Sequence, residues 1–361
     1  MIIKTYEYYL IKLFLRKIFY ISLVFFSLIF ILSNFDEVSY FKDLDLGFYF
    51  PFFLTFLNAP STLFEIFPFI FLIGTQFFFI ELINKDELEI FKVHGTNNLK
   101  IIKIIFMTSF VLGILLIAVF YNFSSKFKFL YLDLKNSYSN DNKYLAVVNE
   151  NGLWIKDEID NKIYIINAIK IKNNFLKEVS ISQFDDKFEL IKVIRSSEVN
   201  ILNKEWLIFN PKITFMDNKT IDSNENLKIL THFDEEKINS LFRNLGSLGF
   251  MQLLKLNKDY ESLGYSTTEV KSYLNKLIAF PIYLSIMTVF ASILMFNIKK
   301  NKSIIFYVIL GILFSVLIYY AYYLFNFLGE SEKIPLLLSS WLPLLILVII
   351  ISIGLVRINE K

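Results

Sequence analysis

The chain contains no cysteine and only two histidines, and both shortages limit the chemistry open to it. Without cysteine there is no disulfide framework and no thiol site, and the redox compartment is not indicated. His94 and His232 are far apart in the sequence, and neither has a neighbouring cluster of ligand side chains. A metal site, which needs several such ligands close together, is therefore not expected.

Sequence motifs of catalysis are also missing. The chain has no GxxxxGK[ST] loop for nucleotide phosphates, no GxSxG elbow and no HExxH helix. Its long apolar segments lack the paired ionisable side chains that a proton relay requires. We therefore expect neither an enzyme nor a cofactor, but a protein that moves something with energy supplied elsewhere. The small net charge of +3 gives no indication of nucleic acid binding.

Apolar residues are abundant, at 55% of the 361 residues, and the mean hydropathy is +0.50. They form long runs at both ends of the chain, around a polar middle. Each run is long enough to cross the hydrocarbon core of a membrane as a helix. These observations predict an α-helical integral membrane protein with six transmembrane helices, at residues 18–35, 63–83, 104–123, 277–298, 303–328 and 334–356.

The distribution of lysine and arginine predicts the orientation of these spans. Four basic residues precede the first run, and lysines follow the second and fourth runs, at 85–103 and 299–302. Acidic residues dominate the connection at 36–45. The positive-inside rule then places both termini in the cytoplasm and the polar middle on the outer side of the membrane. Glu65 and Glu81 lie near opposite ends of the second run, where a structural role is the better interpretation of each.

The polar middle has the alternating pattern of strands, from about Ser124 to Leu230. Residues 179–182, 188–193 and 212–215 alternate, and turn signals separate them. This spacing predicts an inserted periplasmic all-β domain, either a sandwich or jelly-roll-like. The predicted divisions are an N-terminal membrane half at 1–123, the β domain with a helical return at 124–265, and a C-terminal membrane half at 266–361.

Residues 84–95 lie between the second and third runs and are too polar to enter a membrane. Asn84 and Glu87 have the spacing of a capping box, and Gly95 is typical of a helix end. The apolar residues of this short helix do not form one stripe, as they would on a membrane surface. A groove of a cytoplasmic partner suits such a helix better. An ordinary loop is the alternative.

Several of these segments resemble motifs of a known family. Residues 63–69 (LFEIFPF), Gly74-Thr75, 86–88 (DEL) and Gly95 are similar to its "YELLPF", "GT", "SEL" and "AxG" elements, in the same order. Residues 151–157 (NGLWIKD) resemble a "GLWxKD" strand, and 264–281 resemble its return into the fourth helix. The family comprises the LptF/LptG permease subunits of the lipopolysaccharide exporter, and LptG is the closer match. The resemblance covers nearly the whole chain.

The resemblance implies partners and a task. The chain would pair with an LptF-like permease as a heterodimer and with a cytoplasmic ATPase dimer, which binds the ATP. Lipopolysaccharide would leave the inner membrane, where membrane lipid surrounds the complex, and pass to periplasmic bridge proteins of jelly-roll fold. Residues 84–95 would then be the coupling helix. Glu87, Leu88, Phe91 and Gly95 are the expected contacts with the ATPase.

The resemblance also suggests a lipid path, with Ser33, Lys42, Trp154 and Trp206 as candidates. From the residues alone, both tryptophans are better placed in the core of the β domain, with the wall of a groove as the alternative. Family members often carry lysines near the outer end of the first helix, but here residues 33–37 read SNFDE. Lys42 remains a candidate for phosphate contact, and a ligand with other charged groups stays open.

Two other functions remain as alternatives. One is another ABC-linked permease, for lipoprotein release or mechanotransduction, although those permeases usually carry their large outer domain after the first helix. The other is a membrane scaffold that transports nothing. A scaffold has no need of a segment that engages an ATPase, so co-purification of an ATPase would separate it from the permeases.

Overall fold

A computed structural model describes the chain between Lys4 and Asn359, with short gaps. The residues left out within this range are 43–46, 48, 139–152, 160, 161, 173, 187, 217–219, 223–225, 232, 236, 237, 239–243, 263–266, 299–302 and 332. Predictions that involve His232, the Asn151-Gly152 turn or the basic connection at 299–302 lie outside the described residues.

The chain forms two compact units. The first, called the membrane unit here, comprises residues 1–131, 245–257 and 266–361. The second, called the β unit, comprises residues 132–244 and 258–265. The β unit is thus inserted between two stretches of helices, as the sequence predicted.

Among the residues that the structure describes, six helical segments are long and apolar enough to cross a membrane, which confirms the predicted number of spans. The third segment is continuous through a π-helical stretch, Leu116–Tyr121, and its last helix runs on to Tyr138. The strand pattern expected from Ser124 is therefore wrong for this part. The six segments are α1 (Thr5–Tyr40), α3 (Phe67–Asn84), α5 and α6 (Asn98–Leu115 and Asn122–Tyr138), α9 (Thr268–Phe296), α10 (Ile304–Glu330) and α11 (Leu336–Asn359).

The second predicted span begins inside a separate helix. A single residue, Ile66, separates helix α2 (Tyr49–Glu65) from α3 and is the N-cap of α3. Pro68 lies in the first turn of α3, where the missing N–H of a proline costs no hydrogen bond. The break leaves Glu65 as the last residue of α2.

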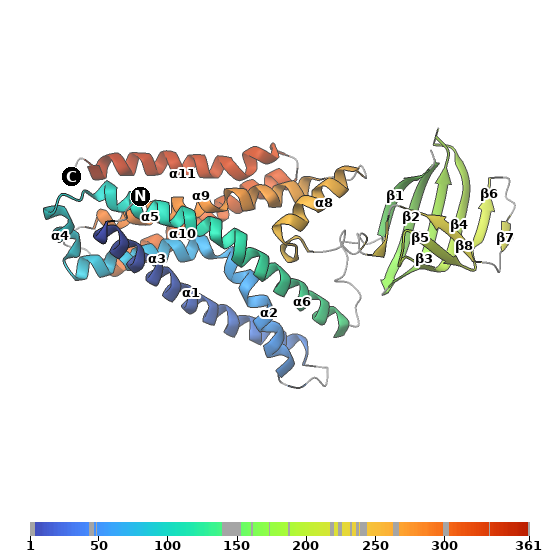
Figure 1. Ribbon diagram of the computed structural model, residues 1–361, viewed down its shortest axis with the longest axis horizontal. Helices are drawn as coiled ribbons and strands as arrows, with labels where there is room; N and C mark the ends of the chain where they lie inside the picture. Colours follow the sequence, from blue (N-terminus) through green and yellow to red (C-terminus); the bar gives the residue numbers. More distant parts are fainter. Residues whose placement is uncertain are drawn as a thin grey trace. The chain divides into compact units, whose positions relative to one another are not determined.

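Helices α3 and α9 are mostly buried within the membrane unit, whereas α1, α10 and α11 expose apolar side chains. Figure 1 shows the course of these helices. Small residues allow close packing at the centre. A Cβ added to Gly113 of α5 would lie 2.7 Å from the Cα of Pro281 in α9. One turn away, the hydroxyls of Ser109 and Thr288 are 2.8 Å apart. Such contacts between small and polar residues are typical of helices packed in a membrane.

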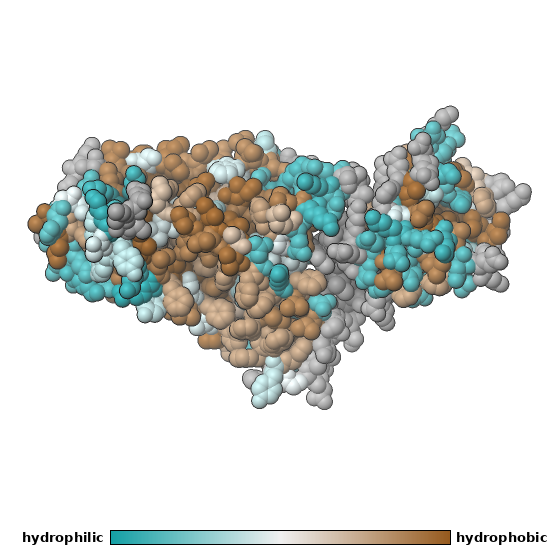
Figure 2. Space-filling view, viewed as in Figure 1, coloured by the Kyte–Doolittle hydropathy of each residue, from teal (hydrophilic) through white to brown (hydrophobic). Residues whose placement is uncertain are grey.

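The outer surface of these helices is broadly hydrophobic, as Figure 2 shows, and polar residues gather near the end that carries α4 (Glu87–Val93). Aliphatic and aromatic side chains on α1, α10 and α11 are exposed along most of their length. In water this surface would be a large unfavourable patch, so lipid or another membrane subunit must cover it.

The β unit is built from eight described strands in one antiparallel sheet, of order β1-β2-β3-β4-β5-β8, with β6 and β7 on a branch. The branch arises at β4, whose last residues pair with β5 while its first residues pair with β6. The strands are β1 (Leu153–Ile159), β2 (Lys162–Lys172), β3 (Phe175–Phe184), β4 (Leu190–Asn200), β5 (Glu205–Phe209), β6 (Lys212–Phe215), β7 (Thr220–Asp222) and β8 (Leu227–Leu230).

The predicted all-β insertion is thereby confirmed, with small differences at its turns. Phe188, expected in a strand, has φ 65° in the turn that Asp185 and Glu189 close, so β4 begins only at Leu190. Asn210 has φ 42° in the predicted turn between β5 and β6. The chain returns to the membrane unit through a 3-10 turn, Leu245–Ser247, and helix α8, Phe250–Ser262.

Trp206 lies in the core of the β unit. Its side chain has no exposed surface, and its indole N–H donates a 2.8 Å hydrogen bond to the backbone oxygen of Phe233. Asp157 is buried as well and accepts a 2.7 Å bond from the hydroxyl of Thr231. A buried polar group needs such a partner, and both bonds tie the β1–β8 sheet to the segment that follows it.

Candidate functional site

The first candidate site is α4, the short helix between the second and third spans. It begins at Glu87 after Asp86, which has φ 57° and gives no side-chain cap. The capping box predicted between Asn84 and Glu87 is therefore not formed. Asp86 is the N-cap residue and adopts the left-handed backbone conformation, so Asn84 is not the residue that precedes the helix.

The other end of α4 has the geometry predicted for Gly95. This glycine has φ 80°, its N–H donates to the oxygen of Lys92, and the next N–H, of Thr96, donates to the oxygen of Phe91. These two bonds form a Schellman motif, in which a residue without a β-carbon adopts the left-handed conformation at little cost. The length of α4 is thus fixed by its C-terminal turn.

One face of α4 packs on the beginning of α1. The hydroxyl of Tyr9 lies 2.8 Å from both carboxylate oxygens of Glu87. The Phe91 ring lies 6.5 Å from the rings of Tyr6 and Tyr9, a separation at which aromatic pairs still attract each other. Glu87 and Phe91 are four residues apart and therefore share this face. Two of the four residues expected to contact the ATPase thus lie against the chain's own first helix.

The opposite side of α4 is exposed. Val93 has 85% of its surface accessible and Ile90 has 52%, whereas Leu88 is half-buried. The sequence interpretation did not single out Ile90 or Val93, because Phe91 is larger. The signal that could have found them is the helical wheel, since a face occupied by Glu87 and Phe91 leaves Val93 on the far side.

An ion-pair cluster lies at the same end of the membrane unit. Glu81 of α3 pairs with Arg16 at 2.8 Å, with Lys85 at 2.7 Å and with Lys17. Arg16 and Lys17 belong to α1, so the cluster joins α1 to α3 just before α4 begins. Together with the Tyr9–Glu87 contact, it makes the start of α1 the support of α4.

The four residues proposed for a lipid path lie in different surroundings. Ser33 is half-buried in α1, and Lys42 is exposed just after the end of that helix. In the β unit, Trp206 is buried in the core, but Trp154 on β1 has 53% of its surface exposed. Of the two tryptophans, Trp154 is therefore the one whose side chain a ligand could reach.

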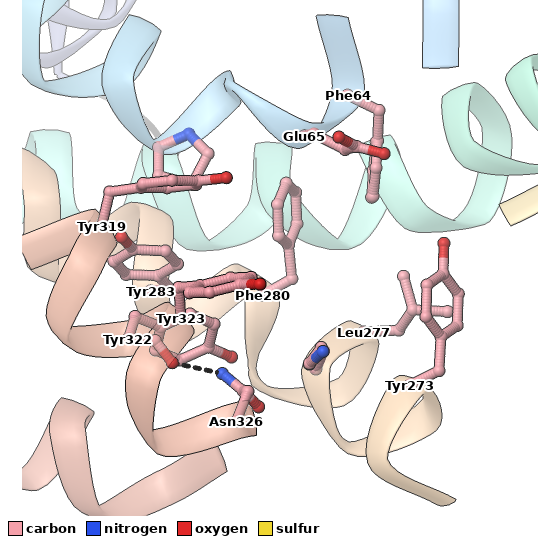
Figure 3. A pocket seen from close by; sticks show the side chains of 12 residues that line it. Phe64, Glu65, Tyr273, Leu277, Phe280, Tyr283, Tyr319, Tyr322, Tyr323 and Asn326 are labelled. Atoms are coloured by element: carbon pink, nitrogen blue, oxygen red, sulfur yellow. Dashed lines mark hydrogen bonds between the residues drawn. The ribbon is translucent and has the colours of Figure 1, made fainter. Parts of the chain in front are cut away.

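The structure adds a second candidate site that the sequence interpretation missed. A cavity of about 260 Å³ lies between the break after α2, the start of α9 and the end of α10. Figure 3 shows the side chains around it, which are mostly aromatic, with the Glu65 carboxylate among them. Its lining residues are Phe64, Glu65, Pro68, Tyr273, Lys276, Leu277, Phe280, Tyr283, Tyr319, Tyr322, Tyr323 and Asn326.

The aromatic side chains of this cavity, called the tyrosine cavity below, are held in place by ring contacts. Tyr283 stacks on Tyr322 at 4.9 Å, and Phe64 stacks on Phe280 at 4.5 Å. Asn326 donates to the backbone oxygen of Tyr322 at 2.7 Å. The three tyrosines of α10 follow the i, i+3, i+4 spacing of one helix face, which was the available signal. This spacing was not recognised in the sequence because aromatic residues are abundant throughout the chain, at 18%.

None of these arrangements resembles a catalytic centre. Among the residues that the structure describes, no group of three or more histidine, aspartate or glutamate side chains could hold a metal ion. What the membrane unit offers instead is a supported surface helix at one end and an aromatic cavity at the other. Such a pair of features fits a protein that receives force and contacts a ligand.

Comparisons with known proteins agree with this description. A comparison with curated proteins finds no matching sequence. The family model described as lipopolysaccharide export system permease LptF/LptG matches residues 8–357, nearly the whole chain. The chain therefore belongs to the LptF/LptG family and is a permease subunit of the ABC transporter that exports lipopolysaccharide, without catalytic activity or a cofactor of its own, the ATPase being the separate subunit LptB.

Proposed function

We propose that this chain is the LptG-type permease, paired with an LptF-like permease and driven by an LptB dimer bound at α4. The family supplies the general function, and the observation that carries the coupling role is the two-sided packing of α4. One side, with Glu87 and Phe91, is held by α1. The other side presents Ile90 and Val93 to solvent.

A helix that transmits force needs one side that binds the partner and another side that contacts its own chain. Exposed apolar residues on a short helix bind a partner's groove by burying their surface. Contacts with the same chain carry the displacement onward, here to α1 and, through Glu81, to α3. We therefore assign Ile90 and Val93, with Leu88, to the ATPase contact. Glu87, Phe91 and Gly95 then fix the position and length of α4.

The proposed orientation puts both termini and α4 in the cytoplasm, and the β unit in the periplasm as the link to the bridge proteins. The resemblance of β1 to the "GLWxKD" strand supports LptG over LptF. Because the chain has no cysteine, a single introduced cysteine reports on its own position. Cysteine at Asn97 should escape an impermeant thiol reagent in spheroplasts, and cysteine at Glu205 should react. The reverse pattern would contradict this orientation.

The coupling role is tested by reconstituting the complex in liposomes with lipopolysaccharide. Val93→Asp should release most of the ATPase and abolish ATP-dependent lipid release, because a charge replaces an apolar contact in the groove. Met216→Asp is the matched control, since it makes the same kind of change at an exposed apolar residue of the β unit. Normal ATPase retention and lipid release in Val93→Asp would disprove the coupling role of α4.

A further inference from the structure

The tyrosine cavity contains one acidic side chain whose charge is not matched locally. Glu65 lines the cavity, and among the described residues it makes no hydrogen bond or ion pair. The other charged lining residue is Lys276, which pairs with Glu330 at 2.7 Å. The lysine charge is therefore already balanced by this carboxylate, which a hydrogen bond from the Ser272 hydroxyl also holds.

Other charges near Glu65 come from two lysines. Lys128 and Lys276 are the cations whose fields reach its carboxylate. The amine of Lys128 donates a 2.8 Å hydrogen bond to the side-chain oxygen of Asn58, outside the cavity lining. The lining therefore presents a carboxylate, a lysine held by its own partner, and aromatic rings.

Aromatic rings and a carboxylate together favour a cation. A ring face attracts a positive charge through its quadrupole, and the attraction grows when water is excluded. Tyr319 and Tyr323 are exposed towards the outside of α10, whereas Tyr283 is buried. Together with Tyr322 and Tyr273 they line the same cavity as Glu65. A phosphate would be repelled by Glu65 at this position.

We infer that the tyrosine cavity binds an ammonium group carried on the polar head of a lipid. This inference rests on the proposed function, because it names a feature of the transported or surrounding lipid that this permease would recognise. The carboxylate of Glu65 would pair with the ammonium, and the rings would cover it. The hydroxyls of the exposed tyrosines, Tyr319 and Tyr323, can bond the neighbouring hydroxyl or ester oxygens of the same head.

The position of the cavity suits a lipid head. It lies within the membrane unit, beside the first half of α9 and the second half of α10. In the proposed orientation this is the periplasmic end of the spans, at the level of the outer-leaflet head groups. The aliphatic residues exposed along α10 then provide an apolar surface for the attached acyl chains.

The inference predicts a preference that binding can measure. The probes are two preparations of phosphoethanolamine-bearing lipid A that differ only in the amine, which is free in one and N-acetylated in the other. They are presented to the detergent-solubilised complex of both permeases and the ATPase. The wild-type complex should bind the amine-bearing lipid about tenfold more tightly. Glu65→Gln, which keeps the shape but removes the charge, should bring the two affinities within about twofold of each other. Equal affinities in the wild type, or an unchanged preference in Glu65→Gln, would overturn the inference.

Substitutions of two tyrosines test whether the aromatic rings of the cavity contribute to binding the ammonium group. Tyr323 lines the cavity and is 61% exposed, whereas Tyr320 on the same helix does not line it and is 64% exposed. Tyr323→Leu should reduce the amine preference about threefold, and Tyr320→Leu should leave it unchanged. An equal effect of both substitutions would contradict a role of the cavity rings.

Two further measurements distinguish a lipid head from a soluble amine, and lipid binding from lipid transport. Soluble phosphoethanolamine should not displace the lipid at an equal concentration, and displacement would overturn the lipid assignment in favour of a soluble amine. ATP-dependent release of lipopolysaccharide is measured in parallel on the wild-type complex in liposomes. A wild-type complex that binds with the expected preference but releases no lipid would contradict the proposed function alone.

Discussion

Glu81 and Glu65 lie near opposite ends of the second span, and their surroundings are opposite in kind. Glu81 is paired with three cations, two from α1 and one from the residue that caps the end of α3. Glu65 lines an aromatic cavity and has no ion pair among the residues that the structure describes. In the sequence both are single glutamates at the edges of an apolar run, and both received the same structural interpretation.

The difference separates a carboxylate that holds helices together from one available to a ligand. At the α4 end, charge is balanced within the chain, and the unsatisfied surface is apolar, at Ile90 and Val93. At the cavity end, aromatic rings line the space, and the exposed carboxylate of Glu65 has no counterion among the described residues. The two ends are therefore suited to different partners: a protein groove at the α4 end and a cation at the cavity end.

The largest expected effect is on the Glu81 cluster. Glu81→Lys would place a fourth positive charge among Arg16, Lys17 and Lys85, in a site where the glutamate side chain is only 14% exposed. Mutual repulsion and the loss of three ion pairs should destabilise the membrane unit by about 2 to 4 kcal/mol. Thermal unfolding of the purified permease pair in detergent measures this as a lower Tm.

Glu189→Lys is the control for that measurement, because it reverses the charge of an exposed glutamate in the turn before β4. It should change stability by less than about 0.5 kcal/mol, as surface substitutions usually do. The comparison of the two glutamates also predicts that Glu65→Lys is far milder than Glu81→Lys. Equal losses at both positions would mean that Glu65 holds helices as Glu81 does.

A smaller effect is expected from the support of α4. Phe91→Ala removes the ring that packs against Tyr6 and Tyr9 and should loosen α4 from α1 by about 1 to 2 kcal/mol. Hydrogen exchange of the amides of 87–95 in the free permease pair would then be faster. Val93→Asp should leave this exchange unchanged, since Val93 is exposed. Faster exchange in Val93→Asp as well would contradict the two-sided description of α4.

Much of this architecture could be predicted from the sequence. Six spans follow from apolar runs because a membrane imposes the length of each run, and alternating strands identify the insertion. Gly95 was predicted as a helix end from its residue type, because the left-handed conformation that it adopts is local to the chain. Features that depend only on residues close together in the sequence could thus be predicted.

Features that depend on tertiary packing were not. Trp154 and Trp206 look alike in their strands, yet one is exposed and the other is buried against the segment around Phe233. Phe91 was expected to face a partner because it is large, but the tyrosines that cover it are more than 80 residues away in the sequence. The tyrosine cavity needs four helices to meet, so no single stretch of sequence contains it.

The smallest effect expected concerns two glycines at the two ends of the membrane unit. A β-carbon added to Gly95 or to Gly47 would meet no other atom within 4 Å, so neither substitution creates a clash. They differ in the backbone, since Gly95 has φ 80° and Gly47 does not have a φ in the left-handed region. Gly95→Ala should therefore cost about 1 kcal/mol, confined to α4 and its C-terminal turn, and Gly47→Ala should cost little or nothing.

Because α4 then ends in a strained turn, the affinity of the permease pair for the ATPase should fall about fivefold in Gly95→Ala, as measured by titration of the ATPase onto immobilised liposomes. Restoration of the affinity by Gly95→Asn, a residue that tolerates this conformation better than alanine, would attribute the loss to the backbone. An affinity of Gly95→Ala equal to that of Gly47→Ala would show that the ATPase does not depend on how α4 ends.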